Sequence, residues 1–536
     1  MGSITVNRLA WARPGGAPLF EDVSFHVNEG AKVGLVGANG VGKTTLVRLI
    51  SGDAAAVGEA AQEGTISIEG RLGIMRQLVG SIRDETTVRD LCIALAPERF
   101  ATAARRLADA EHKMLADPTD TDAATRYASR ISDWGEAGGY EEEARWDASV
   151  QRAVGDGLDT IGERRMATFS GGEQKRIALE LLLRGDHDVL LLDEPDNFLD
   201  VAGKRWLEDE LRKTAKTVLF VSHDRELLAG AATKIVTIEA HGAWTHGGSF
   251  STYHDARVTR MDKLAHDRSV HDAERERLVE IVKEMRVRAK ISATFAPRLQ
   301  AAESRLRQFD EREDAPAEIA REQKVAMKLR GGRTGKKALT MEALSLDGLT
   351  DPFDGEIWFG ERVAVLGANG AGKSHFLRLV AGDPSVAHTG SLRLGARVVP
   401  GHFNQTHDQP ELHGQTLLQL LEKRDVVLGP AMGMLRRYEL AGCSDQKFET
   451  LSGGQQARFQ ILLLELGGAT LLLLDEPTDN LDLVSAEALE SALAEFEGTV
   501  MAVTHDRWFL RGFDRFLVFE DDCKVRDLME PPPRWT

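Results

Sequence analysis

The sequence predicts an α/β protein in which one domain fold occurs twice, with a long helical segment between the two copies. The first observation is an internal repeat, since GLVGANGVGKTT at residues 34–45 returns as AVLGANGAGKSH at 364–375. The second is the segment 255–337, which has few glycines and reads as charged helices. The third is length, because 536 residues with 42% hydrophobic content are too many for one core.

The composition excludes several classes of protein. No apolar run is long enough to cross a membrane and the N-terminus does not have the pattern of a signal peptide, so we expect a cytoplasmic protein. The three cysteines are far apart and lack C-x-x-C spacing, which argues against a disulfide framework or a thiolate metal site. The net charge of −17 argues against general nucleic-acid binding and leaves only local basic segments as candidates.

The repeat extends well beyond the glycine-rich motif. The further matching pairs are FSGGEQKR (169–176) with LSGGQQAR (451–458), LLLDEPDNFLD (190–200) with LLLDEPTDNLD (472–482), and SHDR (222–225) with THDR (504–507). Both halves have 23 residues from the SGG serine to the DEP aspartate and 30 from that aspartate to the histidine. Identical spacing predicts one fold made twice.

The first half is longer at one place. Gln77 precedes Ser170 by 93 residues, whereas Gln405 precedes Ser452 by 47. We expect a helical insert at about 96–155, with DPTDTD as the turn of an antiparallel helix pair. The predicted units are domain one at 1–252, a basic helical linker at 253–338 and domain two at 339–536.

The glycine-rich motif follows a buried parallel strand and opens a helix, which is the context of a phosphate-binding loop. Its glycines let backbone N–H groups close around phosphates, its lysine reaches the terminal phosphates, and the hydroxyl after the lysine can ligate Mg²⁺. The candidate nucleotide-binding residues are Gly37, Asn39, Gly40, Gly42, Lys43, Thr44 and Thr45 in the first half and Gly367, Asn369, Gly370, Gly372, Lys373 and Ser374 in the second.

Paired carboxylates end a buried apolar run in each half. Asp193 and Asp475 stand where a Mg²⁺ ligand is needed, and the following Glu194 and Glu476 stand where a base would polarise the attacking water. The alternative, that two acids merely end a strand, has little weight beside a matched phosphate loop.

Two further motifs accompany these carboxylates. His223 and His505 follow another apolar run, where they would contact a γ-phosphate or serve as structural histidines. Each SGG motif places a serine cap and glycines at a helix start, a second anion-binding helix end in each half. The residues concerned are Ser170, Gly171, Gly172, Ser452, Gly453 and Gly454.

With these motifs present twice, the sequence resembles the ABC ATPase superfamily. The resemblance implies two ABC-type P-loop ATPase domains, each with a helical subdomain, that bind ATP and Mg²⁺ and pair head to tail within one chain. It adds Gln77 and Gln405 as nucleotide and metal contacts. The implied first site combines Lys43, Thr44, Gln77, Asp193, Glu194 and His223 with Ser452 and Gly454. The implied second site combines Lys373, Ser374, Gln405, Asp475, Glu476 and His505 with Ser170 and Gly172.

The sequence departs from the family pattern at a few positions. His375 replaces a hydroxyl residue after the loop, and Asp196, Phe198, Asp479 and Asn480 alter the TNHLD motif. None of these changes removes a phosphate or Mg²⁺ ligand, so both sites are expected to hydrolyse ATP. The resemblance also implies an aromatic residue that stacks on adenine, for which the first half offers Trp11, a residue that would equally suit ordinary packing.

The linker separates this chain from other ABC proteins. The segment 255–337 has 21 Lys or Arg and 15 Asp or Glu, so it is basic in an otherwise acidic chain. A helix through ERERLVEIVKEMRVR is broken at Ala296–Pro297, and a second helix follows. Two ABC domains, no membrane domain and a basic helical hairpin linker resemble the ABC-F family.

The ABC-F resemblance implies binding in the tRNA exit site of the ribosome, with the hairpin reaching toward P-site tRNA and the peptidyl-transfer centre. Basic helices suit RNA because guanidinium groups pair with phosphates. The candidate RNA contacts are Arg286, Arg288, Lys290 and Arg298. The turn at 292–297 is short, so protection from antibiotics and indirect action through tRNA or rRNA both stay open.

Two other functions compete with translation. The chain would also suit the tandem ATP-binding subunit of a membrane transporter such as a drug exporter, although a basic hairpin has no evident use there and no stable membrane partner is expected. A nucleic-acid remodelling ATPase would share the hairpin but should bind free DNA or RNA. The leading expectation is a monomeric ribosome-binding ATPase.

Overall fold

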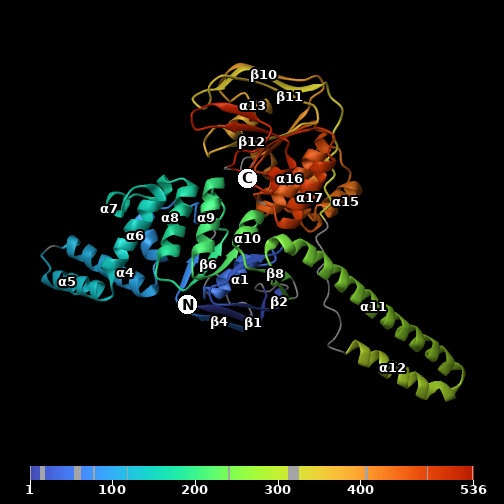
Figure 1. The fold of residues 1–536 in the computed structure, drawn as a ribbon. Coiled ribbons are helices and arrows are strands. Elements are labelled where there is room, and N and C mark those ends of the chain that lie inside the picture. Colours follow the sequence, from blue (N-terminus) through green and yellow to red (C-terminus); the bar gives the residue numbers. More distant parts are fainter. Residues whose placement is uncertain are drawn as a thin grey trace.

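The computed structural model describes residues 2–12, 18–53, 62–76, 79–117, 119–239, 242–311, 325–404, 409–479, 481–533 and 535. Two α/β domains lie one above the other in Figure 1, and a helical hairpin extends from the region where they meet. The predicted fold class, two ABC-type P-loop domains joined by a hairpin linker, is confirmed.

The first domain contains two sheets. A three-stranded antiparallel sheet has the order β2-β1-β4, and a six-stranded sheet has the order β5-β6-β7-β3-β8-β9. In the larger sheet only the β8–β9 pair is antiparallel. The strands are β1 Ser3–Ala12, β2 Pro18–Val27, β3 Lys32–Val36, β4 Gln62–Glu69, β5 Leu72–Met75, β6 Val189–Asp193, β7 Thr217–Val221, β8 Lys234–Glu239 and β9 Gly242–His246.

The second domain repeats both sheets with the same topology. The orders are β11-β10-β13 and β14-β15-β16-β12-β17-β18. The strands are β10 Lys337–Leu346, β11 Phe353–Trp358, β12 Arg362–Gly367, β13 His388–Leu394, β14 Pro400–Phe403, β15 Leu471–Asp475, β16 Thr499–Val503, β17 Arg515–Phe519 and β18 Val525–Leu528. The repeat in the sequence is therefore a repeat of topology.

Equivalent helices accompany the sheets. In the first domain they are α1 Lys43–Ile50, α3 Val88–Leu95, α4 Glu98–Ala116, α5 Thr121–Glu136, α6 Gly139–Val154, α7 Leu158–Ile161, α8 Gly171–Arg184, α9 Val201–Lys213 and α10 Arg225–Ala231. In the second they are α13 Lys373–Val380, α14 Leu417–Glu422, α15 Leu428–Arg437, α16 Gly453–Gly467 and α17 Leu483–Glu495. Short 3₁₀ turns are η1 Met166–Thr168, η2 Ala293–Phe295, η3 Pro410–Leu412, η4 Ala441–Cys443, η5 Phe448–Thr450 and η6 Phe509–Gly512.

The central strands are buried on both faces. All five residues of β6 and all five of β15 are buried, and so are those of β7 and β16. Their sequences are near-continuous runs of leucine and valine, as expected for parallel strands with no face exposed to water. These strands end in the carboxylates and histidines, so the core fixes the position of the site.

Helices α4, α5 and α6 of the first domain lie within residues 96–155, where the sequence predicts a helical insert. Helices α4 and α5 lie side by side and extend away from the domain in Figure 1. The chain turns between Ala116 and Thr121, within the expected DPTDTD turn, and Asp120 caps α5 by accepting from two backbone N–H groups. Trp134 of α5 and Trp146 of α6 pack with ring centroids 6.0 Å apart and hold the insert to the domain core.

The linker is a two-helix hairpin, α11 Phe250–Ile291 and α12 Ala296–Asp310. The two helices pack through the buried side chains Val282 and Ala302 and through an ion pair from Arg275 to Asp310. Only Ser292 and the turn η2 separate the helices, and Pro297 stands in the first turn of α12, where proline is tolerated. In Figure 1 the tip of the hairpin is the point of the linker farthest from both domains.

Candidate functional site between the domains

The glycine-rich loops have the backbone that their sequence predicts. Gly42 has a φ of 106°, and a Cβ there would lie 2.7 Å from a methyl carbon of Leu19. Only glycine adopts such a conformation without strain. The Lys43 ammonium donates to the carbonyl oxygens of Gly37 (2.7 Å) and Ala38 (3.2 Å). The loop thus curls around its own lysine at the start of α1.

The second loop is built in the same way. The Lys373 ammonium donates to the carbonyl oxygens of Gly367 (2.9 Å) and Ala368 (2.8 Å). Burial lowers the pKa of Lys43 to about 8, although nearby carboxylates oppose this effect, and burial lowers the pKa of Lys373 in the same direction. Both ammonium groups are therefore poorly solvated cations, which favours the approach of a polyanion.

The strand-end aspartates have the environment of a hard-cation ligand. Burial raises the pKa of Asp193, and a hydrogen bond from the Thr44 hydroxyl opposes that rise; Asp475 and Ser374 repeat the arrangement. One carboxylate oxygen of each aspartate is buried without a hydrogen-bond partner among the described residues. A hydroxyl beside a carboxylate with a free oxygen fits Mg²⁺, which prefers oxygen ligands and binds through few protein groups.

The glutamates that follow these aspartates are held in unusual backbone conformations. Glu194 has a φ of 50° and Glu476 a φ of 47°, a left-handed region that costs energy for a residue with a Cβ. A carboxylate oxygen of Glu194 accepts from the Asn197 side chain at 2.7 Å, whereas one of Glu476 accepts from the backbone N–H of His505 at 3.0 Å. The two glutamates therefore have different partners.

The Glu476 carboxylate has a strongly perturbed pKa. Its pKa is raised well above the ordinary value, first by burial and then by the charges of Asp479 and Asp475. A raised pKa keeps a carboxylate ready to accept a proton near neutral pH. This is the property that a base polarising a water molecule needs.

His505 lies against Glu476 and the second phosphate loop. Its Nε2 is 3.1 Å from Asn369 Oδ1 and 3.4 Å from a Glu476 oxygen. Burial and the Lys373 charge lower the pKa of His505 to about 3, and burial with the Lys43 charge does the same for His223. Both imidazoles are neutral at physiological pH, so their ring nitrogens can donate or accept.

The SGG motifs open helices as predicted. Ser170 accepts from the N–H of Glu173 while Glu173 accepts from the N–H of Ser170, a capping box at the start of α8. Ser452 and Gln455 form the same motif at the start of α16. The remaining N–H groups of each first turn point away from the helix and can bind an anion.

A cavity of about 600 Å³ brings the first SGG motif to the second phosphate loop. The residues of the implied second site that line it are Ser170, Gly172, Lys373, Ser374, Asp475, Glu476 and His505. The other nucleotide-binding candidates that line it are Gly171, Asn369, Gly370 and Gly372. Groups from both domains thus face one space large enough for a nucleotide. His375, Asp196 and Phe198, which depart from the family pattern, also line it.

The first phosphate loop contacts the second domain as well. The backbone N–H of Asn39 donates to a carboxylate oxygen of Asp482 at 3.0 Å. The next residue, Leu483, packs with the core of the first domain, and its equivalent Val201 packs with the core of the second. The two DEP segments therefore exchange apolar side chains across the boundary.

Two equivalent ion pairs connect the domains. Arg225 of the SHDR motif pairs with Glu490, and Arg507 of the THDR motif pairs with Glu208 at 3.0 Å. Each residue of one pair is 282 positions from its equivalent in the other, the offset of the repeat. The contact consequently has approximate twofold symmetry, which a head-to-tail pairing of two similar domains requires.

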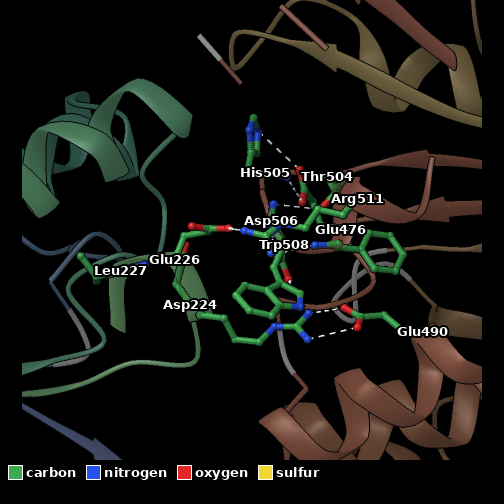
Figure 2. Close-up of polar contacts among 12 residues, drawn as sticks. Asp224, Glu226, Leu227, Glu476, Glu490, Thr504, His505, Asp506, Trp508 and Arg511 are labelled. Carbon is green, nitrogen blue, oxygen red and sulfur yellow. Dashed lines mark hydrogen bonds and ion pairs between the residues drawn. The ribbon is translucent and has the colours of Figure 1, made fainter. Parts of the chain in front are cut away.

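Figure 2 shows a further cluster beside these pairs, where Trp508, Arg511 and Glu226 lie together. Arg511 pairs with Glu226 at 2.5 Å, and its guanidinium carbon is 4.1 Å from the centre of the Trp508 ring. Arg225 lies over the same ring at 5.3 Å. Arginine over tryptophan is a favourable cation–π contact.

Several predicted residues lie elsewhere. Gln77, Gln405 and Asn480 are outside the described residues. Trp11 is 7% exposed and packs in the core beneath the small sheet, so adenine stacking by Trp11 stays a prediction. Thr45 belongs to the first turn of α1. Gly453 and Gly454 open α16 in the second domain.

The four candidate RNA contacts are on the linker. Arg286 pairs with Glu303 across the hairpin at 2.6 Å, and Arg288 pairs with Glu284 at 2.5 Å. The guanidinium groups of Arg288 and Arg298 flank the Phe295 ring at 6.0 and 5.7 Å. Lys290 belongs to the last turn of α11, beside the tip.

Two features of the interface were missed by sequence reasoning. Lys204 is buried and lies 3.1 Å from Asp224, and the nearby charges of Asp196, Asp479 and Asp506 raise its pKa. Trp535, close to the C-terminus, packs at the domain boundary. Both lie outside the repeated motifs, and the position equivalent to Lys204 is Ala486.

Comparison with known proteins agrees with this geometry. The family model described as "ABC transporter" matches residues 20–197 and 350–479. An antibiotic resistance protein of Mycobacteroides abscessus is 50% identical over 99% of this chain and 100% of its own length. The energy-dependent translational throttle protein EttA of Haemophilus influenzae is 30% identical over 97% of this chain and 92% of its own length.

A plant protein and a solved structure extend the comparison. ABC transporter F family member 5 of Arabidopsis thaliana is 30% identical over 95% of this chain and 74% of its own length. The archaeal ribosome recycling factor aABCE1, solved with the ribosomal stalk protein aP1, superposes with a TM-score of 0.57 and 19% identity. The match covers 97% of this chain and 89% of the aABCE1 chain. At that identity the likeness concerns the fold alone.

In the described part of the chain, no helix has the length and apolar character needed to cross a bilayer. Matching family models in both halves, full-length relatives at 30% to 50% identity and motifs repeated in both halves all agree. The chain belongs to the ABC-F family of tandem ABC ATPases and is an enzyme that hydrolyses ATP to ADP and phosphate.

Proposed function

We propose that this ATPase binds the ribosome at the tRNA exit site when ATP holds its two domains together, and leaves after hydrolysis. The linker hairpin then reaches toward P-site tRNA and the peptidyl-transfer centre, and the protein modulates translation. The moving units are residues 1–252 and 339–536, joined by residues 253–338. The protein acts as a cytoplasmic monomer whose partners are rRNA and tRNA.

The nucleotide chemistry assigns a role to each group of the two sites. Lys43 and Lys373 bind the terminal phosphates of ATP, and Thr44 with Asp193 and Ser374 with Asp475 hold Mg²⁺, which supplies charge neutralisation on the phosphates. Gln77 and Gln405 contribute to the same sites.

Two glutamates and two histidines act on the attacking water and the γ-phosphate. Glu194 and Glu476 accept its proton, while His223 and His505 hydrogen-bond the γ-phosphate. The SGG helix of the opposite domain binds the phosphates from the other side, so that ATP completes the contact between the domains.

The observation that carries the ribosomal function is the hairpin. Its basic tip is held away from both domains, and Arg288, Arg298 and Phe295 form a cluster of charge and aromatic surface there. Such a cluster suits a folded RNA, since guanidinium groups bind phosphates and both arginine and aromatic planes stack on bases. The full-length similarity to a translational throttle protein supports the same conclusion.

A decisive experiment traps the ATP-bound form. We expect the double variant Glu194→Gln and Glu476→Gln, with ATP, to sediment with 70S ribosomes and to inhibit translation in vitro. The Lys43→Ala and Lys373→Ala double variant is the matched control, since it cannot bind the nucleotide phosphates and should stay in the supernatant. Sedimentation with membranes in place of ribosomes would support a transporter subunit and overturn the proposal.

Protection of the ribosome from an antibiotic is a second candidate function. A protein named for antibiotic resistance is 50% identical over 99% of this chain, which favours this activity. We expect expression in a drug-sensitive host to raise the minimal inhibitory concentration of at least one ribosome-targeting antibiotic. The glutamine double variant should not protect, because it cannot leave the ribosome. Equal susceptibility with and without the gene, across the ribosome-targeting classes, would remove this candidate.

A further inference from the structure

The C-terminal tail crosses from the second domain to the first. After β18 the chain passes through Pro531, Pro532 and Pro533, a run that restricts the backbone to extended conformations. The Arg205 guanidinium of α9 donates to the carbonyl oxygen of Pro533 at 3.0 Å. The C-terminus lies near the boundary of the two domains in Figure 1. The tail is therefore fastened to the opposite domain.

This anchoring places Trp535 on His505. The two rings have centroids 5.6 Å apart and planes inclined by 14°, a stacked arrangement. Trp535 is only 5% exposed and belongs to the apolar cluster that also contains Val201 of the first domain. The indole covers one face of the imidazole and is itself held by both domains.

The edge of the same imidazole is held by different groups. The ring Nε2 lies 3.1 Å from Asn369 Oδ1 and 3.4 Å from a Glu476 oxygen. The backbone N–H of His505 also donates to Glu476. Rotation about the side-chain bonds of His505 would break the two Nε2 contacts, and the stacked indole limits movement of the ring toward that face. The ring is thus restrained in its plane by the site and across its plane by the tail.

Within the described residues, this stacking is found at the second site. Among the described residues, no aromatic ring stacks on His223, the equivalent of His505 in the first half. The position equivalent to Trp535 in the first half is Tyr253, which packs in the core of the first domain and stacks on Phe250. Two sites with the same reacting groups consequently differ in how their histidine is supported.

We propose that Trp535 is a positioning residue for His505, which makes ATP hydrolysis in the second site depend on the C-terminal tail. This inference rests on the proposed role of His505 at the γ-phosphate. With the indole in place, the imidazole stays beside Glu476 and Asn369, where it meets the γ-phosphate. Without the indole, the imidazole has space to rotate away from the γ-phosphate, so a smaller fraction of bound ATP is held in the geometry needed for hydrolysis.

The test measures each site separately. In a Glu194→Gln background, turnover reports the second site, and in a Glu476→Gln background it reports the first. We expect Trp535→Ala to lower kcat about tenfold in the first background, with KM for ATP unchanged, and to have no effect in the second. Trp535→Phe should restore most of the rate, because phenylalanine retains a stacking face. Met529→Ala, an exposed change in the same tail, is the matched control.

A second variant tests the tail without changing either ring, in case Trp535→Ala does not fold. Arg205→Ala removes the anchor of Pro533 without touching either ring, and we expect a smaller loss of kcat confined to the second site. Equal loss in both backgrounds, no loss in either, or a Trp535→Phe variant as slow as Trp535→Ala would overturn the proposal. If Glu194→Gln or Glu476→Gln alone keeps full ATPase activity, the proposed role of the glutamates as bases would be wrong. That failure is separate from failure of the tail proposal, because these variants leave Trp535 unchanged.

Discussion

The ammonium of Lys204 lies 3.1 Å from the carboxylate of Asp224 in the middle of the contact between the domains. Burial opposes the charge on Lys204, but the carboxylates around it outweigh burial and raise its pKa. Two of those carboxylates, Asp479 and Asp506, belong to the second domain. Lys204, a buried cation of the first domain, therefore compensates acidic groups of both domains.

Removal of that cation should weaken the contact strongly. In Lys204→Met the side chain keeps its length, but buried carboxylates lose their partner, which costs about 3–5 kcal/mol for a buried pair. We expect a clearly lower thermal midpoint and a higher ATP concentration for half-maximal ATPase activity. A second change, Asp479→Asn, should recover part of the loss. Lys213→Met, at an exposed position of the same helix, is the control; a midpoint equal to that control would contradict the prediction.

The same cluster should respond to pH in a defined direction. Burial and neighbouring carboxylates raise the pKa of Asp196 and of Asp479 to about 6, against 3.8 for an ordinary aspartate. The folded protein therefore holds these protons more tightly than the unfolded chain, so their contribution to stability is largest near pH 4 and is lost as the pH rises through 6.

The measurement is a comparison with a variant that cannot titrate. We expect the stability of the native chain relative to Asp196→Asn/Asp479→Asn to be greater at pH 5 than at pH 7, as read from thermal midpoints. His223 and His505, whose lowered pKa values act in the opposite direction, are present in both chains and cancel. A difference that is constant with pH, or larger at pH 7, would refute this account.

The reciprocal ion pairs should be energetically coupled. A double-mutant cycle on Arg225→Ala and Glu490→Ala should give a coupling energy of about 1–3 kcal/mol, because Arg225 is 3% exposed and a buried partner is costly to lose. The equivalent cycle on Arg507 and Glu208 should give a similar value. The exposed pair Arg130 and Asp133 of the insert is the control, with no more than about 0.5 kcal/mol. Equal coupling in all three cycles would mean that the interdomain pairs add no specific stability.

The parts of the fold and of the candidate site that could be predicted from the sequence are those that the internal repeat marks. The phosphate loops, the strand-end carboxylates and the SGG helices are local motifs with fixed spacing, so their positions in the fold were predictable. Glu208 and Glu490 also obey the offset of 282 and could have been found by it. Lys204 and Trp535 could not, since neither is repeated and each acts on residues brought near only by the pairing of the domains.

The last prediction concerns the hairpin. Neutralising Arg286, Arg288, Lys290 and Arg298 should leave ATPase activity in the absence of ribosomes unchanged, because these residues lie toward the tip of the hairpin, which extends away from both domains. Ribosome binding by the Glu194→Gln/Glu476→Gln protein should weaken, because the variant loses contacts with RNA phosphates. Each lost contact should also make the slope of log K against log salt shallower by about 0.7–0.9.

A matched control removes the same number of charges from the exposed surface of domain two, at Arg393, Lys423, Lys524 and Arg526. If the hairpin binds RNA directly, the linker variant loses affinity and salt dependence, whereas the control loses neither. Phe295→Ala should weaken binding without altering the salt dependence, because the phenylalanine supplies stacking surface and no charge. Equal losses from the linker and control variants would mean that the net charge of the chain, and not the hairpin, sets the affinity.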